Sequence, residues 1–169
     1  MTAVINTSVL VLLDPNNQHQ QFDGHYDAQL FSRFTDKNRC VLHVLSRLAH
    51  VRLLHFFIPN AENTLISARV TLFKNTIFYI YCIDETSVAA MKQIYNYPMF
   101  VKIFHVQWLS TYLYQAAIAH LVEQAERTQH EPEEYDTALQ AAAEFANILA
   151  NELNEHMVVK TGVQPDDRI

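Results

Sequence analysis

The chain has 169 residues, half of them hydrophobic, with 12 Lys or Arg against 18 Asp or Glu and a formal net charge of −6. This length fits one domain with an ordinary core, and so much apolar and aromatic mass excludes a wholly disordered chain. Glycine occurs only at Gly24 and Gly162. Glycine-rich phosphate loops, dinucleotide-binding fingerprints and G-x-S-x-G nucleophile elbows are therefore excluded, because each needs several glycines close together.

The two cysteines, Cys40 and Cys82, lie inside apolar runs. We interpret both as buried thiols that act as small hydrophobic residues, not as nucleophiles or members of a disulfide framework. No apolar run approaches the roughly 18 residues of a membrane span, and the first residues lack the basic region and cleavage site of a signal peptide. We therefore expect a cytoplasmic protein that needs no cofactor and makes no membrane contact.

The N-terminal third is predicted to hold a strand followed by two helices. Residues 3–13 are rich in Val, Ile and Leu and end at Asp14-Pro15, which is typical of a buried strand. After a polar loop, Asp27 can cap a helix over 27–36. The helical spacing of apolar residues predicts another helix over 38–50.

The middle of the chain has the composition of β-strands. Residues 51–59 form an apolar run that ends in proline, which predicts a strand. Two β-rich runs then flank Lys74-Asn75, which predicts a β-hairpin with a two-residue turn. The second run, 77–83, is almost wholly apolar and aromatic, so we expect a central strand that is buried on both faces.

A helix and a last strand complete the predicted sheet. Asp84 follows the central strand and can cap a helix over 85–95. Residues 99–106 are predicted to be the last strand. The predicted fold of residues 1–106 is therefore an α/β core, with α+β as the alternative: a small mixed sheet with a central hairpin and with helices packed on it.

From residue 107 onward the apolar periodicity is helical. Polar residues and a proline separate two helices, which we expect to form an antiparallel hairpin over 107–157, packed on the core within the same domain. Residues 158–169 are predicted to be a flexible tail. Steps of three and four residues on the second helix predict a coiled-coil seam with small residues in its middle, a candidate protein interface: Leu139, Ala142, Ala146, Leu149 and Leu153.

Charge is divided along the chain. Residues 1–102 hold nine basic and seven acidic residues, a net of +2, whereas residues 103–169 hold three and eleven, a net of −8. The acidic hairpin is either a binding surface for a basic partner or a solvated helix face. Basic residues concentrate within 33–74. They could contact phosphates if the fold brings them together, and they are scattered surface residues if it does not. These residues are Arg33, Lys37, Arg39, Arg47, Arg52, Arg69 and Lys74.

Carboxylates at strand ends provide a further hypothesis. In open α/β sheets, ligands bind at the carboxyl ends of the strands. Asp14 follows the first predicted strand, and Asp84 and Glu85 follow the central one. If those strands are neighbours, these carboxylates could hold a divalent cation. The alternative is that they cap turns and helices.

The missing catalytic loops, the scarcity of glycine and the seam together favour a non-enzymatic interaction protein. Such an adaptor or complex subunit would use its acidic helical hairpin to bind a protein partner or a second copy of itself. Two alternatives stay open from the sequence. One is a nucleic-acid-binding protein that uses the basic residues of 33–74, and the other is a metal-dependent hydrolase or nuclease that uses the strand-end carboxylates.

Overall fold

The computed structural model describes residues 8–161, with side chains described as far as Met157. The described residues form two compact units that divide between Leu109 and Ser110. The first unit is a parallel β-sheet with helices, and the second is a pair of long helices. The predicted α/β class is therefore confirmed.

The sheet has five strands in the order β2-β1-β3-β4-β5, and every neighbouring pair is parallel. Because β2 and β3 lie on opposite sides of β1, the strand order reverses there, which makes the carboxyl ends of β1 and β3 the topological switch point. The strands are β1 (Ser8–Leu13), β2 (Phe31–Phe34), β3 (Leu53–Pro59), β4 (Thr76–Cys82) and β5 (Val101–His105).

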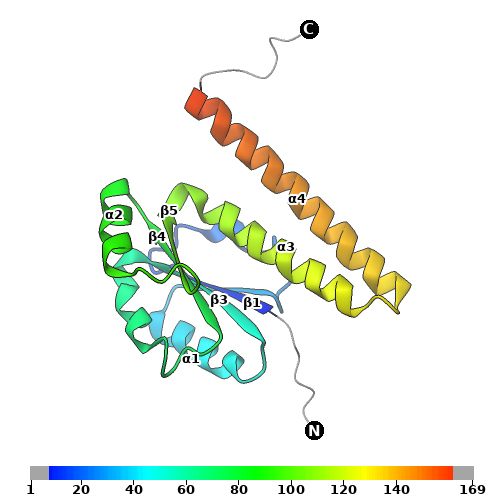
Figure 1. Cartoon of the computed structure of the whole chain (residues 1–169), viewed down its shortest axis with the longest axis horizontal. Coiled ribbons are helices and arrows are strands. Elements are labelled where there is room, and N and C mark those ends of the chain that lie inside the picture. The colour runs from blue at the N-terminus through cyan, green and yellow to red at the C-terminus, as the bar shows by residue number, and fades with distance from the viewer. Residues whose placement is uncertain (1–7, 162–169) are drawn as a thin grey trace. The chain divides into compact units, whose positions relative to one another are not determined.

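One face of the sheet is covered by α1 (Lys37–Leu48), the 3-10 segment η2 (Asn60–Ala68) and α2 (Glu85–Ile94) (Figure 1). Asp36 starts α1 by accepting a hydrogen bond from the backbone N–H of Arg39. The buried side chains of these segments join alternate strand residues in one apolar core that includes Val11, Cys40, Val44, Phe56, Ile66, Phe78 and Val88.

The opposite face of the sheet is also buried, but it carries polar groups. Leu10, Leu12 and Phe57 are fully buried there. Beside them, the Nδ1 atom of His55 lies 2.8 Å from the hydroxyl of Tyr79, so the two side chains share a buried hydrogen bond between neighbouring strands. Burial on both faces explains the continuous apolar runs in the sequence. It confirms the predicted strand, which spans Thr76–Cys82, whereas Ile83 lies outside the strand and is exposed.

The predicted hairpin around Lys74-Asn75 is wrong, and the sheet is parallel, not mixed. Because β4 runs parallel to β3, the chain between them must cross over the sheet and cannot simply reverse. Residues 60–68 make that crossing as η2, and Ile66 and Phe73 pack into the core. A turn does occur at Asn75, whose φ is 56°, but it leads into β4 from this crossing segment.

The predicted helix over 27–36 is wrong as well, since Phe31–Phe34 forms the edge strand β2. The side chain of Asp27 accepts a hydrogen bond from the backbone N–H of Gln29, which makes a local turn and not a helix cap. Phe31 pairs with Leu10 in register and is buried. Pairing with β1 therefore overrides the weak helical spacing of this segment.

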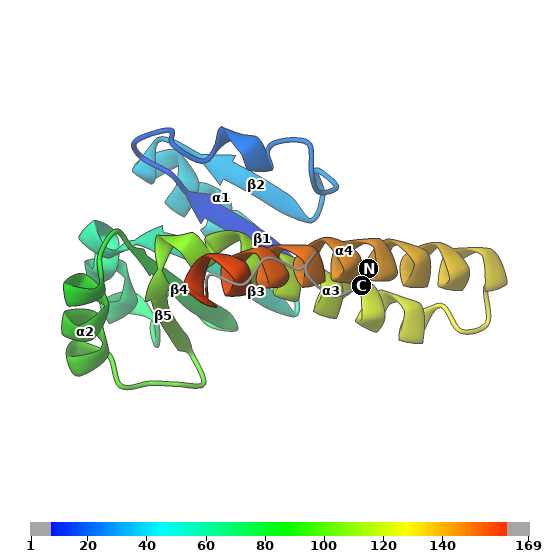
Figure 2. The same cartoon turned by 90° about the horizontal axis from the view of Figure 1, so that it is seen from above.

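The second unit is an antiparallel hairpin of α3 (Leu109–Arg127), which enters it at Ser110, and α4 (Pro132–Thr161) (Figure 2). The hydroxyl of Ser110 donates to the carboxylate of Glu152 at 2.8 Å, so the start of α3 lies beside the late turns of α4. α4 continues four residues past its predicted end, and residues 162–169 of the predicted tail lie outside the described residues. Packing of the hairpin on the core stays a prediction. No described helix is both long and apolar enough to cross a membrane.

Candidate functional site

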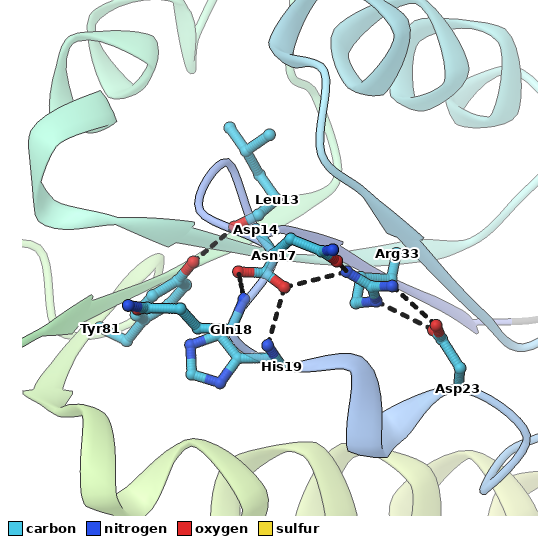
Figure 3. A network of polar contacts seen from close by, with 8 residues as sticks. All are labelled: Leu13, Asp14, Asn17, Gln18, His19, Asp23, Arg33 and Tyr81. Atoms are coloured by element: carbon cyan, nitrogen blue, oxygen red, sulfur yellow. Dashed lines mark hydrogen bonds and ion pairs between the residues drawn. The ribbon is translucent and has the colours of Figure 1, made fainter.

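A network of polar contacts between side chains and backbone N–H groups closes the loop at the carboxyl ends of β1 and β2 (Figure 3). Asp14 follows β1, and 2% of it is exposed. Its Oδ1 accepts from the backbone N–H of Gln18 at 3.0 Å, and its Oδ2 accepts from the N–H of His19 at 2.9 Å and from Nη1 of Arg33 at 3.0 Å. We call this network the Asp14 clasp, which consists of Asp14, Asn17, Gln18, His19, Asp23 and Arg33.

Arg33 enters the clasp from β2. Its Nε and Nη2 atoms donate to the two carboxylate oxygens of Asp23 at 3.0 and 2.7 Å, and Nη1 also donates to Oδ1 of Asn17 at 2.7 Å. This bidentate pair lowers the pKa of the Asp23 carboxyl and raises the pKa of Arg33. All three guanidinium nitrogens donate inside the clasp, so Arg33 belongs to this network and not to a phosphate-binding surface.

Two rings cover the clasp on the side of β4. The hydroxyl of Tyr81 donates to the carbonyl of Leu13 at 2.6 Å, and the edge of the His19 ring meets Tyr81 with ring centroids 5.4 Å apart. Burial raises the pKa of the Tyr81 hydroxyl and lowers the pKa of the His19 imidazole, so both side chains are neutral near pH 7. The clasp thus holds a loop whose only regular element is the three-residue segment η1 (Gln20–Phe22), where parallel strands usually have a helix.

The structure does not bring Asp14 together with Asp84 and Glu85. β3 lies between β1 and β4, so the assumption that these carboxylates follow neighbouring strands is wrong. As predicted, Asp84 caps α2, where it accepts from the backbone N–H of Ser87 at 2.6 Å, and this hydrogen bond lowers its pKa. Within residues 8–161, no group of three or more His, Cys, Asp or Glu side chains is arranged to hold a metal ion.

Both thiols are buried in the core, as predicted. Burial raises the pKa of Cys40 to about 12 and the pKa of Cys82 to about 11. The thiolate is the nucleophilic form of cysteine, so neither side chain is activated for covalent catalysis near neutral pH.

An open groove lies at the opposite edge of the sheet, where the strands begin. A hollow of about 440 Å³ borders the starts of β3 and β4 and the residues that precede β5. Three of the seven predicted phosphate contacts line it, and none of its lining residues is an Asp or a Glu. We call it the amino-edge groove, lined by residues that include Arg52, Arg69, Val70, Lys74, Met99 and Phe100.

The remaining basic residues of 33–74 lie elsewhere. The Nζ atom of Lys37 forms an ion pair with Glu62 at 2.7 Å. Arg39 and Arg47 belong to α1 and do not line the groove. The basic residues predicted as one set are therefore divided among the clasp, an ion pair, α1 and the groove.

α4 presents two apolar stripes. The inward seam follows alternating steps of three and four residues, and two of its members, Ala138 and Ala142, are 5% and 6% exposed. Its contacts with α3 include the rings of Tyr114 and Phe145, whose centroids are 5.6 Å apart. The inward seam consists of Tyr135, Ala138, Ala142, Phe145, Leu149, Glu152 and His156, which are buried or half-buried.

The second stripe of α4 faces solvent and also follows steps of four and three residues. We call it the outward stripe, which consists of Leu139, Ala143, Ala146, Ala150 and Leu153, all exposed. The predicted interface residues divide between the two stripes. Ala142 and Leu149 lie in the inward seam, whereas Leu139, Ala146 and Leu153 lie in the outward stripe.

Comparisons of the chain with protein-family models, with curated proteins and with solved structures each gave no match. Sequence reasoning missed Tyr97 and Phe100, whose rings lie against Arg69 beside the groove. It also missed the partners of Asp14 within the clasp. The polar loop residues after Asp14-Pro15 were the available signal, because a parallel connection without a helix needs side chains to hold it.

Proposed function

We propose that this chain is a non-enzymatic interaction protein, an adaptor or complex subunit, whose α4 binds a basic amphipathic helix of a partner protein. The outward stripe carries the proposal, because its spacing is that of a coiled-coil seam and its residues are exposed. The proposal includes the cytoplasm as the compartment, where two free cysteines stay reduced.

The composition of the outward stripe suits a helix as the partner. Leu139 and Leu153 are 38% and 36% exposed, and three exposed alanines lie between them. Small side chains in the middle let a second helix approach closely, and the leucines offer apolar contacts on either side. An incoming helix would therefore remove apolar surface from water along four turns of α4.

Charge selects the kind of helix. The segment 110–157 contains nine acidic residues and one basic residue, Arg127. That arginine already forms an ion pair with Glu123 at 2.7 Å. Two acidic hairpins repel each other, whereas Lys and Arg on a partner helix complement the field of the hairpin. A basic helix is therefore a better occupant than a second copy of this chain.

The test compares the tagged full-length chain with two variants after purification from its native cells at moderate salt. Leu139→Ser with Leu153→Ser removes both ends of the outward stripe, and Ile148→Ser is the matched control. Ile148 is an apolar residue of the same helix with a similar exposure, 40%, but it lies outside the stripe. Circular dichroism verifies that all forms keep their helix content.

We expect a protein that the wild type and the Ile148→Ser variant retain and that the double variant loses. Carboxylate-to-lysine cross-links should join a basic segment of that protein to α4. Retention of the same protein by the double variant would refute the proposal. A wild-type dimer in light scattering that becomes a monomer in the double variant would also refute it, because a second copy would then be the occupant.

A further inference from the structure

We propose that the amino-edge groove binds single-stranded nucleic acid, with phosphates on its basic side chains and bases against the rings beside Arg69. The groove belongs to the α/β unit, and none of its residues lies on α4. The proposal is therefore independent of the interaction surface on α4 and can fail or hold separately.

The local charge of the groove is opposite to that of the chain. Arg52, Arg69 and Lys74 line it without an acidic residue among the lining side chains, although the whole chain has a net charge of −6. Cations gathered in a concave surface attract anions, and a phosphate backbone offers one negative charge for each nucleotide. The groove therefore selects a polyanion in spite of the acidic composition of the whole chain.

Aromatic rings next to these cations give the groove surfaces on which bases can stack. The guanidinium carbon of Arg69 lies 4.6 Å from the ring centroid of Tyr97 and 5.1 Å from that of Phe100. These two residues are 48% and 45% exposed. Exposed rings and a flat guanidinium beside a basic groove are the combination that single-strand-binding proteins use to hold bases without reading their sequence.

The shape of the surface favours a strand over a single nucleotide. A second hollow of about 260 Å³ shares Arg69 and Val70 with the amino-edge groove, and Tyr97 lines it as well. Arg69 therefore stands between two adjoining hollows. A strand can place successive nucleotides in both, whereas a mononucleotide would occupy only one. Bases of a duplex are paired and stacked inside the helix, so they would not reach the two rings.

The experiment measures fluorescence anisotropy of a labelled oligothymidylate of about 12 nucleotides with the full-length chain, over about 50 to 200 mM KCl. We expect binding that weakens as salt rises. A plot of log affinity against log salt should have a negative slope of about −1 to −2, since each phosphate contact on a single strand contributes about −0.7.

Three variants test the cations and the rings, and a fourth is the control. Arg69→Gln removes a cation and its ring contacts, and Tyr97→Ala removes one stacking surface, so each should weaken binding about tenfold. Arg39→Gln removes the same charge from α1, outside the groove, and should leave the affinity within about twofold. Since Arg69 is half-buried, Lys74→Gln provides a second charge variant at an exposed position, and thermal melts verify folding.

The proposal is overturned by any of three results. One is the absence of binding at the lowest salt. Another is a decrease in affinity for the oligonucleotide in Arg39→Gln that is as large as the decrease in Arg69→Gln. The third is displacement of the oligonucleotide by a polyglutamate peptide of equal charge as effectively as by unlabelled oligonucleotide. That result would assign the groove to an acidic peptide, which needs the cations but not the rings.

Discussion

The two edges of the sheet differ in where their charged side chains find partners. At the carboxyl edge, Asp14 and Arg33 are almost buried, and each is hydrogen-bonded within one loop. At the amino edge, Lys74 is exposed on a surface without acidic lining residues, and Arg69 lies against exposed rings. The charged groups of the carboxyl edge are thus hydrogen-bonded to other protein groups, whereas the amino edge exposes charged and apolar side chains to solvent.

This difference limits a general rule about α/β proteins. Ligands usually bind at the carboxyl ends of parallel strands, at the switch point. Polar residues do gather at that edge here, but they hold a crossover that lacks a helix. Position in the fold therefore indicates where polar groups collect, and the state of their hydrogen bonds decides whether a ligand can use them.

The largest effect is expected from Asp14→Ala at the carboxyl edge. The substitution leaves the backbone N–H groups of Gln18 and His19 without their acceptor, and it removes one of the carboxylates that Arg33 contacts. Loss of a buried charged acceptor should lower the free energy of unfolding by about 2–4 kcal/mol. Urea denaturation of the wild type and the variant, monitored by tryptophan fluorescence and circular dichroism, measures this change in the free energy of unfolding.

Two further variants sharpen that result. Asp14→Asn keeps one carbonyl oxygen for the loop but loses the ion pair, so its stability should lie between those of the wild type and Asp14→Ala. Asp84→Ala removes an exposed helix cap that follows a strand in the same way, and it should cost less than Asp14→Ala. Equal decreases in the free energy of unfolding for Asp14→Ala and Asp84→Ala would mean that Asp14 contributes no more to stability than an exposed helix cap does.

A smaller effect is expected from Tyr81→Phe. This change deletes the hydroxyl that donates to the carbonyl of Leu13 and keeps the ring. The free energy of unfolding should fall by about 1 kcal/mol, the usual contribution of one buried hydrogen bond. Tyr97→Phe is the matched change at the amino edge, where the ring is half exposed, and it should leave the denaturation midpoint unchanged. If Tyr97→Phe lowered the free energy of unfolding as much as Tyr81→Phe does, the proposed difference between the two edges would be wrong.

Much of the fold could be predicted because local signals and tertiary packing agree along most of the chain. Asp84 ends a strand and caps a helix, and the apolar run before it is buried on both faces. The two failures are segments in which spacing fits two structures. Leu30, Phe31 and Phe34 suit a helical face as well as an edge strand, and pairing with β1 decides. Residues 66–73 have strand composition, but a parallel neighbour requires a crossover there.

The candidate surfaces were harder to predict than the fold. Arg69 meets Tyr97 and Phe100 only because the starts of three strands lie at one edge, and spacing in the sequence cannot show this. On α4, two sets of residues follow the same heptad spacing, and the outward stripe is displaced from the inward seam by one residue. The sequence therefore predicts a seam but cannot decide which of its residues face α3 and which face solvent.

At the amino edge, Lys74→Gln should change stability very little. Lys74 is exposed and lies among other cations, so loss of its charge removes repulsion and no buried partner. The free energy of unfolding should stay within about 0.5 kcal/mol of the wild type, or rise slightly at low salt. Urea denaturation at low and moderate salt measures this. A loss comparable to that of Asp14→Ala would mean that the groove is a stabilising element and not a binding surface.

The smallest effect concerns the pH dependence of the carboxyl edge. Burial lowers the pKa of His19 and of His43 below the ordinary value of 6.5. Between the folded and unfolded pKa values the unfolded chain binds more protons, so the free energy of unfolding should fall as pH drops below about 6.5. His19→Phe keeps a ring between Phe22 and Tyr81 and removes that proton site.

Urea denaturation of wild type, His19→Phe and His43→Phe between about pH 7 and pH 5 should give a shallower slope in each variant than in the wild type. The range stops above the titration of Asp23, whose lowered pKa adds a loss of stability in the same direction only at lower pH. If the free energy of unfolding of His19→Phe depended on pH as steeply as that of the wild type, the imidazole would take up its proton without leaving the clasp. Protonation would then be tolerated beside Asp14, and the carboxyl edge would be less closed than its hydrogen bonds indicate.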